Sequence, residues 1–126
     1  MWVDFFRSRT PLAVKNQIKP WILRNDAALC EPVACELLRS AAARERPLIQ
    51  RHFATMPMLR TPASLWTEAT RLGQDCYDAG VMVGALDLLI ATVCIHHGAS
   101  LVTFDAVFAK MATLSRLQAS VLVRVS

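Results

Sequence analysis

Several patterns that define common catalytic and metal-binding classes are absent from this sequence. The 126 residues include four cysteines but no Cys-x-x-Cys pair, and no cysteine stands at zinc-site spacing from a histidine. There are only four glycines, and they form no glycine-rich loop that could cradle a phosphate. A Cys-x5-Arg stretch is also absent. These absences argue against a zinc-finger protein, a phosphate-loop enzyme and a cysteine phosphatase.

Long hydrophobic runs are also missing. The most apolar stretch, Val81 to Ile95, is fifteen residues long and contains Asp87. A membrane-spanning helix needs about 20 apolar residues, and an aspartate at the bilayer centre costs about 2.5–3.5 kcal/mol. We therefore expect a buried core helix here, and no membrane association.

Charged residues are few relative to apolar residues. Charged residues make up 19% of the chain and apolar residues 54%, which is rich for a small monomer. The excess predicts a buried face shared with a partner, either in a homodimer or with a bound partner peptide.

The net charge of +4 is unevenly distributed. Residues 1–60 contain ten Lys or Arg and five Asp or Glu, whereas residues 61–126 contain four and five. The first half is thus the better candidate for contact with a polyanion. The alternative interpretation is that these arginines simply solvate helix faces.

The cysteines indicate a reducing compartment. They are scattered through apolar segments and no secretory signal is apparent, so we expect buried free thiols and a cytoplasmic protein. These cysteines are Cys30, Cys35, Cys76 and Cys94.

Predicted helices and short strands alternate along the chain without repeats or a linker, which is typical of one α/β domain with a mainly parallel sheet. Helices are expected over residues 2–7, 33–46, 48–55, 86–97 and 106–114. Two further helices are expected to begin at Thr10-Pro11 and at Thr61-Pro62. The first should end or kink at Pro20, and the second should stop at Gly80. Strands are expected over 27–30, 58–60 and 100–104, with a final edge strand containing Val121, Val123 and Val125.

Three acidic residues stand in apolar settings close to predicted strand-to-helix junctions. Glu36 and Asp87 are expected in the first turns of their helices, and Asp105 at the carboxyl end of its strand. In an open parallel sheet such positions converge on one crevice. Each carboxylate also has a purely structural interpretation: Asp105 could cap the next helix, Asp87 could complement a helix dipole, and Glu36 could pair with Arg39.

A cluster of three carboxylates would suit a hard divalent cation. Mg²⁺ or Mn²⁺ prefers oxygen ligands and completes its coordination with water and substrate phosphate. Such a metal can activate water for in-line attack on a phosphodiester. Thr103 is a further candidate for contact with a water or phosphate, and Arg39, one turn from Glu36, for contact with a substrate phosphate.

The order of these motifs resembles the PIN domain of the VapC toxin family. The resemblance rests on Trp2-Val-Asp-Phe-Phe-Arg7, Cys35-Glu-Leu-Leu-Arg39, Asp87-Leu-Leu-Ile-Ala91 with His97-Gly98, and Thr103-Phe-Asp105 followed by Phe108-Ala109. It covers essentially the whole chain.

The resemblance implies a three-layer α/β/α fold and a Mg²⁺- or Mn²⁺-dependent endoribonuclease. Such proteins are the toxins of type II toxin–antitoxin systems, usually dimeric and inhibited by a VapB-type antitoxin. Glu36, Asp87 and Asp105 correspond to three of the four acidic site residues of the family. We expect them to be both catalytic residues and metal ligands.

One part of the family pattern has no counterpart in the sequence. Family members begin with an apolar strand that ends in Asp-Thr/Ser-Ser, shortly before the segment that starts here at Trp2. We therefore expect an N-terminally truncated PIN-like domain, residues 1–126, without the central first strand and the first acidic residue. The alternative function is a catalytically impaired domain that only binds an antitoxin or RNA.

The N-terminal helices are the expected docking surface for the antitoxin. They carry more apolar side chains than a small core can absorb, so an amphipathic antitoxin helix could cover part of them while another part supports a homodimer. A basic antitoxin side chain could then reach and neutralise the acidic residues. The apolar residues are Phe5, Phe6, Leu12, Ile18, Trp21, Ile22 and Leu23.

Overall fold

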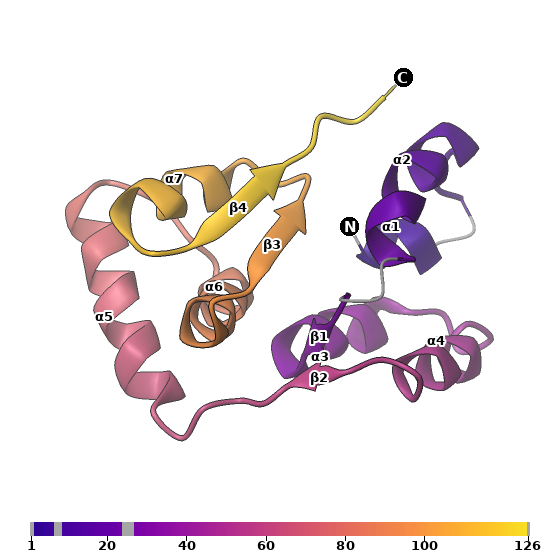
Figure 1. The fold of residues 1–126 in the computed structure, drawn as a ribbon, viewed down its shortest axis with the longest axis horizontal. Coiled ribbons are helices and arrows are strands. Elements are labelled where there is room, and N and C mark those ends of the chain that lie inside the picture. The colour runs from indigo at the N-terminus through magenta and orange to yellow at the C-terminus, as the bar shows by residue number, and fades with distance from the viewer. Residues whose placement is uncertain (1, 7–8, 24–26, 126) are drawn as a thin grey trace. The chain divides into compact units, whose positions relative to one another are not determined.

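The structure is a computed structural model that describes residues 2–6, 9–23 and 27–125. The chain divides into two compact units. Unit 1 comprises residues 1–59 and 124–126, and unit 2 comprises residues 60–123. The helices and strands of each unit are labelled in Figure 1.

The described residues of unit 1 form four helices and a pair of short strands. Its elements are α1 (Trp2–Phe6), α2 (Leu12–Ile22), β1 (Leu29–Cys30), α3 (Glu31–Ser40), α4 (Arg46–Phe53) and β2 (Met58–Leu59). The strands β1 and β2 pair in parallel, with Leu29 opposite Met58. The buried side chains of this unit come from α2, β1, α3 and α4: Val14, Ile18, Ile22, Leu29, Cys30, Pro32, Leu37 and Ile49.

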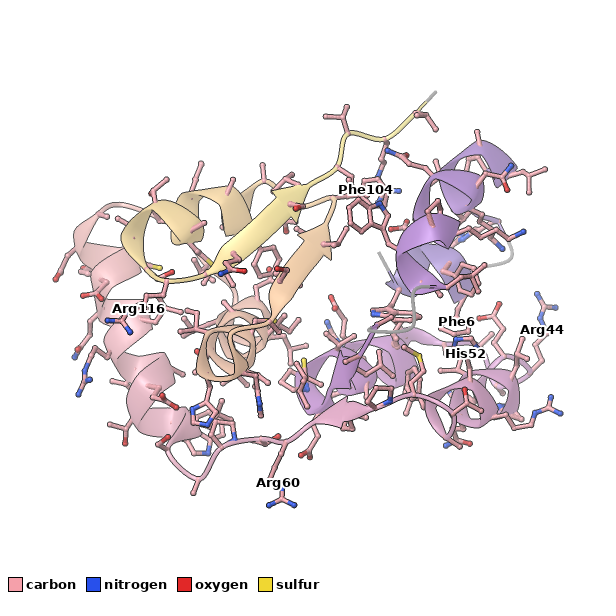
Figure 2. All side chains as sticks on the ribbon, viewed as in Figure 1. Phe6, Arg44, His52, Arg60, Phe104 and Arg116 are labelled. Atoms are coloured by element: carbon pink, nitrogen blue, oxygen red, sulfur yellow. The ribbon has the colours of Figure 1, made fainter. Side chains whose placement is uncertain are left out.

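Aromatic side chains join α1 to α4. The Phe6 ring meets the imidazole of His52 edge to face at 5.3 Å between centroids, and lies 6.4 Å from the ring of Phe53. Figure 2 shows Phe6 and His52 side by side. Such edge-to-face pairs stabilise by about 0.5–1.5 kcal/mol beyond the area they bury. These contacts hold the five-residue helix α1 in place.

The end of the chain also binds to α1 and α2. The guanidinium of Arg124 donates two hydrogen bonds to the carboxylate of Asp4, at 2.9 and 3.0 Å. The backbone N–H of Val125 donates to Oε1 of Gln17 at 3.3 Å. Asp4 is therefore engaged in a structural ion pair, and its side chain is only 17% exposed.

Replacing Arg124 by Gln is expected to destabilise the protein modestly, by about 1 kcal/mol, because the ion pair is bidentate but half of the arginine side chain stays in solvent. Urea unfolding should show a lower midpoint with an unchanged slope. The matched control is Arg116→Gln, at an exposed position of unit 2, where a change within about 0.5 kcal/mol is expected. Equal effects of the two substitutions would contradict a stabilising role for the pair.

Unit 2 has three helices and a longer pair of strands. Its elements are α5 (Leu65–Asp78), α6 (Ala85–His97), β3 (Ser100–Thr103), α7 (Val107–Leu114) and β4 (Gln118–Val121). The strands β3 and β4 pair in parallel over all four residues, and α7 packs beside β4 (Figure 1). The short parallel strands between helices confirm the predicted α/β class.

The central helix of unit 2 is α6, which matches the buried helix expected at 86–97. Five consecutive residues from Ile90 to Cys94 are buried, as expected for a helix that is apolar all round. The helix ends at Gly98, whose φ of 62° is left-handed. The N–H of Ala99 then donates to the carbonyl of Cys94, which closes the helix in a Schellman-type cap.

A carboxylate on α5 joins the end of α6. The hydroxyl of Ser64 donates to Glu68 at 2.8 Å, and Nδ1 of His96 lies 3.4 Å from the same carboxylate. These two partners lower the pKa of Glu68, the serine hydrogen bond contributing most. The contact links the first turn of α5 to the last turn of α6.

Several predicted boundaries are wrong. The helix expected over 33–46 runs from Glu31 to Ser40 instead, and a new helix starts at Arg46. The chain leaves the helix at Ala41, whose ψ of 139° is extended, and Pro47 is well suited to the first turn of α4, where its missing N–H is not needed.

Other differences concern Pro20 and the last strand. Helix α2 passes through Pro20 and ends at Ile22, so of the two expected outcomes the end at Pro20 is not found and the kink stays a prediction. The last strand ends at Val121, and Val123 and Val125 lie beyond it as exposed residues. The alternation of Val123 and Val125 does not arise from pairing with β3, because Thr103, the last residue of β3, already pairs with Val121.

The cysteines are free thiols. Cys30, Cys76 and Cys94 are buried, as expected, but Cys35 is exposed on α3. Among the described helices, none has the length and apolar character needed to cross a membrane.

Candidate functional site

Asp105 sits in a tight turn at the carboxyl end of β3. Thr103, the last residue of the strand, is buried, and its Oγ1 accepts a hydrogen bond from the backbone N–H of Asp105 at 3.1 Å. The carbonyl of Thr103 accepts from the N–H of Leu122 at 2.7 Å. The threonine is therefore held by the neighbouring strand and in turn holds the backbone of Asp105.

The carboxylate of Asp105 points partly into this turn. Its Oδ1 accepts from the N–H of Val107, the first residue of α7, at 2.9 Å. The capping contact weighed from the sequence is therefore present. It occupies one carboxylate oxygen; Oδ2 has no hydrogen bond within the described part of the chain, and the residue is exposed. The turn thus fixes Asp105 with one oxygen still available to a ligand.

Asp87 is the third residue of α6, after the N-cap Gly84. The expectation that it lies in the first turn is confirmed. A carboxylate at this position is favoured by the positive end of the helix dipole. The side chain of Asp87 is partly buried.

Glu36 lies further along its helix than expected. Because α3 begins at Glu31 rather than at Val33, Glu36 is in the second turn and not in the first. It is partly buried, while Arg39, three residues later, is exposed. Within the described residues the two side chains form no ion pair, so the structure lacks the Glu36–Arg39 pair that was the structural alternative for Glu36.

The three acidic residues come from different units. Glu36 belongs to unit 1, whereas Asp87 and Asp105 belong to unit 2. In the described ranges, no group of three or more His, Cys, Asp or Glu side chains stands in an arrangement that could hold a metal ion. The shared site for all three carboxylates stays a prediction.

Sequence reasoning did not foresee the contact that Thr103 makes. In the structure the Thr103 hydroxyl oxygen accepts from the backbone N–H two residues on, and the predicted contact of this hydroxyl with water or phosphate stays a prediction. The sequence signal was present, because a Ser or Thr two residues before a helix-capping Asp is typical of a hydroxyl-supported turn.

Comparison with known proteins gives a consistent result. Residues 2–114 match the PIN domain family. Ribonuclease VapC11 of Mycobacterium tuberculosis is 30% identical over 94% of this chain and 92% of its own length. Ribonuclease VapC21 of the same organism is 30% identical over 88% of this chain and 83% of its own length.

Solved structures show the same fold. A VapBC2 complex from Rickettsia felis bound to a promoter DNA fragment has a TM-score of 0.70 at 19% identity, over 94% of this chain and 91% of that one. VapBC-1 from nontypeable Haemophilus influenzae also has a TM-score of 0.70, at 16% identity, over 95% of this chain and 92% of that one.

This order of helices and short parallel strands is that of a PIN-type α/β protein. Asp87 lies in the first turn of α6, and Asp105 lies just before α7. The chain belongs to the PIN domain family and, within it, to the VapC ribonucleases.

Proposed function

We propose that this protein is the toxin of a type II toxin–antitoxin system and cleaves RNA as an endoribonuclease. The observation that carries this proposal is the 30% identity to relatives named as ribonucleases, which extends over 94% of the chain. The family match over residues 2–114 spans the positions of Glu36, Asp87 and Asp105, which supports a site at these residues.

Metal dependence is the next part of the proposal. Glu36, Asp87 and Asp105 would be the ligands, and the donor set fits Mg²⁺ or Mn²⁺ because it consists of hard carboxylate oxygens without thiolate or imidazole. The available Oδ2 of Asp105 supports this fit. A bound divalent cation would lower the pKa of a coordinated water and neutralise charge on the scissile phosphate.

The residues of the chain itself have distinct roles in this proposal. Thr103 is a positioning residue, because it fixes the backbone from which the Asp105 carboxylate projects. Asp87 lies in the first turn of α6, where the positive end of the helix dipole attracts a negatively charged side chain. Arg39 is exposed one turn from Glu36 and can donate to a phosphate oxygen of RNA.

A VapB-type antitoxin is the proposed inhibitor, by extension from the solved VapBC complexes that share this fold. Of the apolar residues expected to receive it, Ile18 and Ile22 belong to the core of unit 1. Leu12 and Leu23, at the two ends of α2, are 71% and 69% exposed and remain available. We also propose a homodimer, and a cytoplasmic location that suits four free thiols.

The test is cleavage of a labelled single-stranded RNA by the purified chain. Cleavage is expected with Mg²⁺ or Mn²⁺, and none with excess EDTA. Restored metal should recover it, and the co-purified product of the neighbouring reading frame should suppress it. A protein that binds this RNA without cutting it in either metal would support the impaired-domain alternative, and cleavage in EDTA would exclude the metal-dependent chemistry.

A further inference from the structure

We infer that Asp4 and Arg124 are positioning residues of the candidate active site. Their ion pair keeps the end of β4 bonded to Thr103, which in turn holds the backbone of Asp105. The inference rests on the proposed ribonuclease function and adds two residues to the same site. Both lie outside the set of proposed metal ligands, and they act on that set only through the backbone.

The link to the site begins at the end of β4. This strand pairs with β3 up to Val121, which stands opposite Thr103. One residue later, the N–H of Leu122 donates to the carbonyl of Thr103 at 2.7 Å. The Oγ1 of the same threonine accepts from the N–H of Asp105 at 3.1 Å. Thr103 therefore connects the end of β4 to the turn that carries a proposed metal ligand.

The chain is held again two residues further on. The guanidinium of Arg124 donates to both carboxylate oxygens of Asp4, at 2.9 and 3.0 Å. The N–H of Val125 adds a bond to Oε1 of Gln17 at 3.3 Å. The connection to the site is the covalent chain itself, from Leu122 of unit 2 to Arg124 of unit 1. A charged anchor thus follows the Leu122 hydrogen bond almost directly.

An anchored end resists fraying of a short strand. β4 has only four residues, and the last residues of a chain separate most readily unless they are tied down. A residue that frays regains backbone entropy of the same order as the net free energy of one hydrogen bond. The bond at Leu122 is therefore marginal by itself. With Arg124 held on Asp4, Leu122 gains that freedom only after the ion pair opens.

The anchor itself is well fixed. The carboxylate of Asp4 lies on α1, and its side chain is only 17% exposed. The same helix packs on α4 through the edge-to-face contact of Phe6 with His52. A bidentate guanidinium–carboxylate pair also sets direction, because two parallel hydrogen bonds define the plane of the contact. The ion pair therefore fixes both where the chain lies at Arg124 and how it is oriented.

Loss of the anchor should change the turn without removing a ligand. The carboxylate of Asp105 keeps its bond to the N–H of Val107. The bond from its own N–H to Thr103 weakens once the threonine is no longer held from β4. A ligand whose position is less well defined binds its metal less tightly and aligns the reacting groups less well.

The test is amide hydrogen exchange on the full chain, followed at single residues by NMR. Arg124→Gln should speed exchange at Leu122 and Asp105 at least about 5-fold, because both N–H groups lose the support of the anchor. The matched control is Ile49→Val, which removes one methylene from the core of unit 1 and lowers global stability by a similar amount. In this variant exchange at the two positions should stay within about twofold of the wild type, since local fraying does not depend on that packing.

The second readout is the Mg²⁺ requirement of RNA cleavage. In Arg124→Gln the concentration for half-maximal activity should rise about 3- to 10-fold, whereas Ile49→Val should leave it unchanged. The exchanged pair Asp4→Arg/Arg124→Asp restores the attraction with reversed polarity and should recover both readouts to within about twofold. Arg124→Lys, which keeps the charge without the bidentate geometry, replaces the exchanged pair if that variant does not fold. Its values should lie between those of Arg124→Gln and the wild type.

Several results would overturn the inference. Unchanged exchange at Leu122 or at Asp105 in Arg124→Gln excludes the link, and equal acceleration in Ile49→Val reduces it to global stability. Faster exchange with an unchanged Mg²⁺ requirement removes both residues from the support of the site. Exchange is recorded without RNA or metal. A wild-type protein that shows the expected exchange but cleaves no RNA would therefore count against the proposed ribonuclease and not against the link from Arg124 to Asp105.

Discussion

Asp87→Asn is expected to reduce RNA cleavage at least about 100-fold while the protein remains folded. The substitution keeps the shape of the side chain but removes the charge that a divalent cation and a developing phosphate charge both require. Asparagine is also accepted in the first turn of a helix, so the start of α6 should persist. The measurement is the rate of cleavage of a labelled RNA at saturating Mg²⁺, with the far-UV circular dichroism spectrum as the test of folding.

The matched control for this variant is Asp78→Asn. Asp78 is an exposed aspartate at the end of α5, outside the proposed set of ligands. Its replacement is expected to leave the cleavage rate within about twofold. An active Asp87→Asn protein, or an equal loss of activity in both variants, would remove Asp87 from the site.

Local patterns determined most of what the sequence could predict. The largely apolar run from Leu88 to Ile95 and the glycine after His97 are sufficient to specify a buried helix and its end, since both depend on residues adjacent in the chain. The position of Asp87 in the first turn follows from the same helix. Asp105 was likewise predictable, because a strand and its capping aspartate are contiguous.

The failures occur where two local rules compete or where partners are distant. Ala41 to Glu45 favours a helix by composition, but the backbone becomes extended at Ala41 and a new helix begins at Arg46, with Pro47 in its first turn. Val123 and Val125 alternate like a strand, yet β3 has only four residues to pair with. Whether Glu36 joins Asp87 and Asp105 depends on contacts between segments some fifty residues apart, and no local pattern encodes those.

The contact of Thr103 with Asp105 leads to the last prediction. Thr103→Val replaces the hydroxyl with a methyl group of nearly equal size, so the β3 packing is kept, but the Asp105 N–H loses its acceptor. The turn that orients the carboxylate should then loosen. We expect cleavage to fall about 10- to 100-fold, within the range that a misplacement of about 1 Å can cause, and the Mg²⁺ concentration for half-maximal activity to rise.

Thr103→Ser is the matched control for this effect, because it restores the acceptor oxygen while removing only the methyl group. It should recover most of the activity and the wild-type Mg²⁺ requirement. Cleavage by the two variants is compared at several Mg²⁺ concentrations after equal folding has been established by thermal melting. A serine variant as impaired as the valine variant would assign the loss to packing in β3, and a valine variant with wild-type activity would show that Asp105 does not need the support of Thr103.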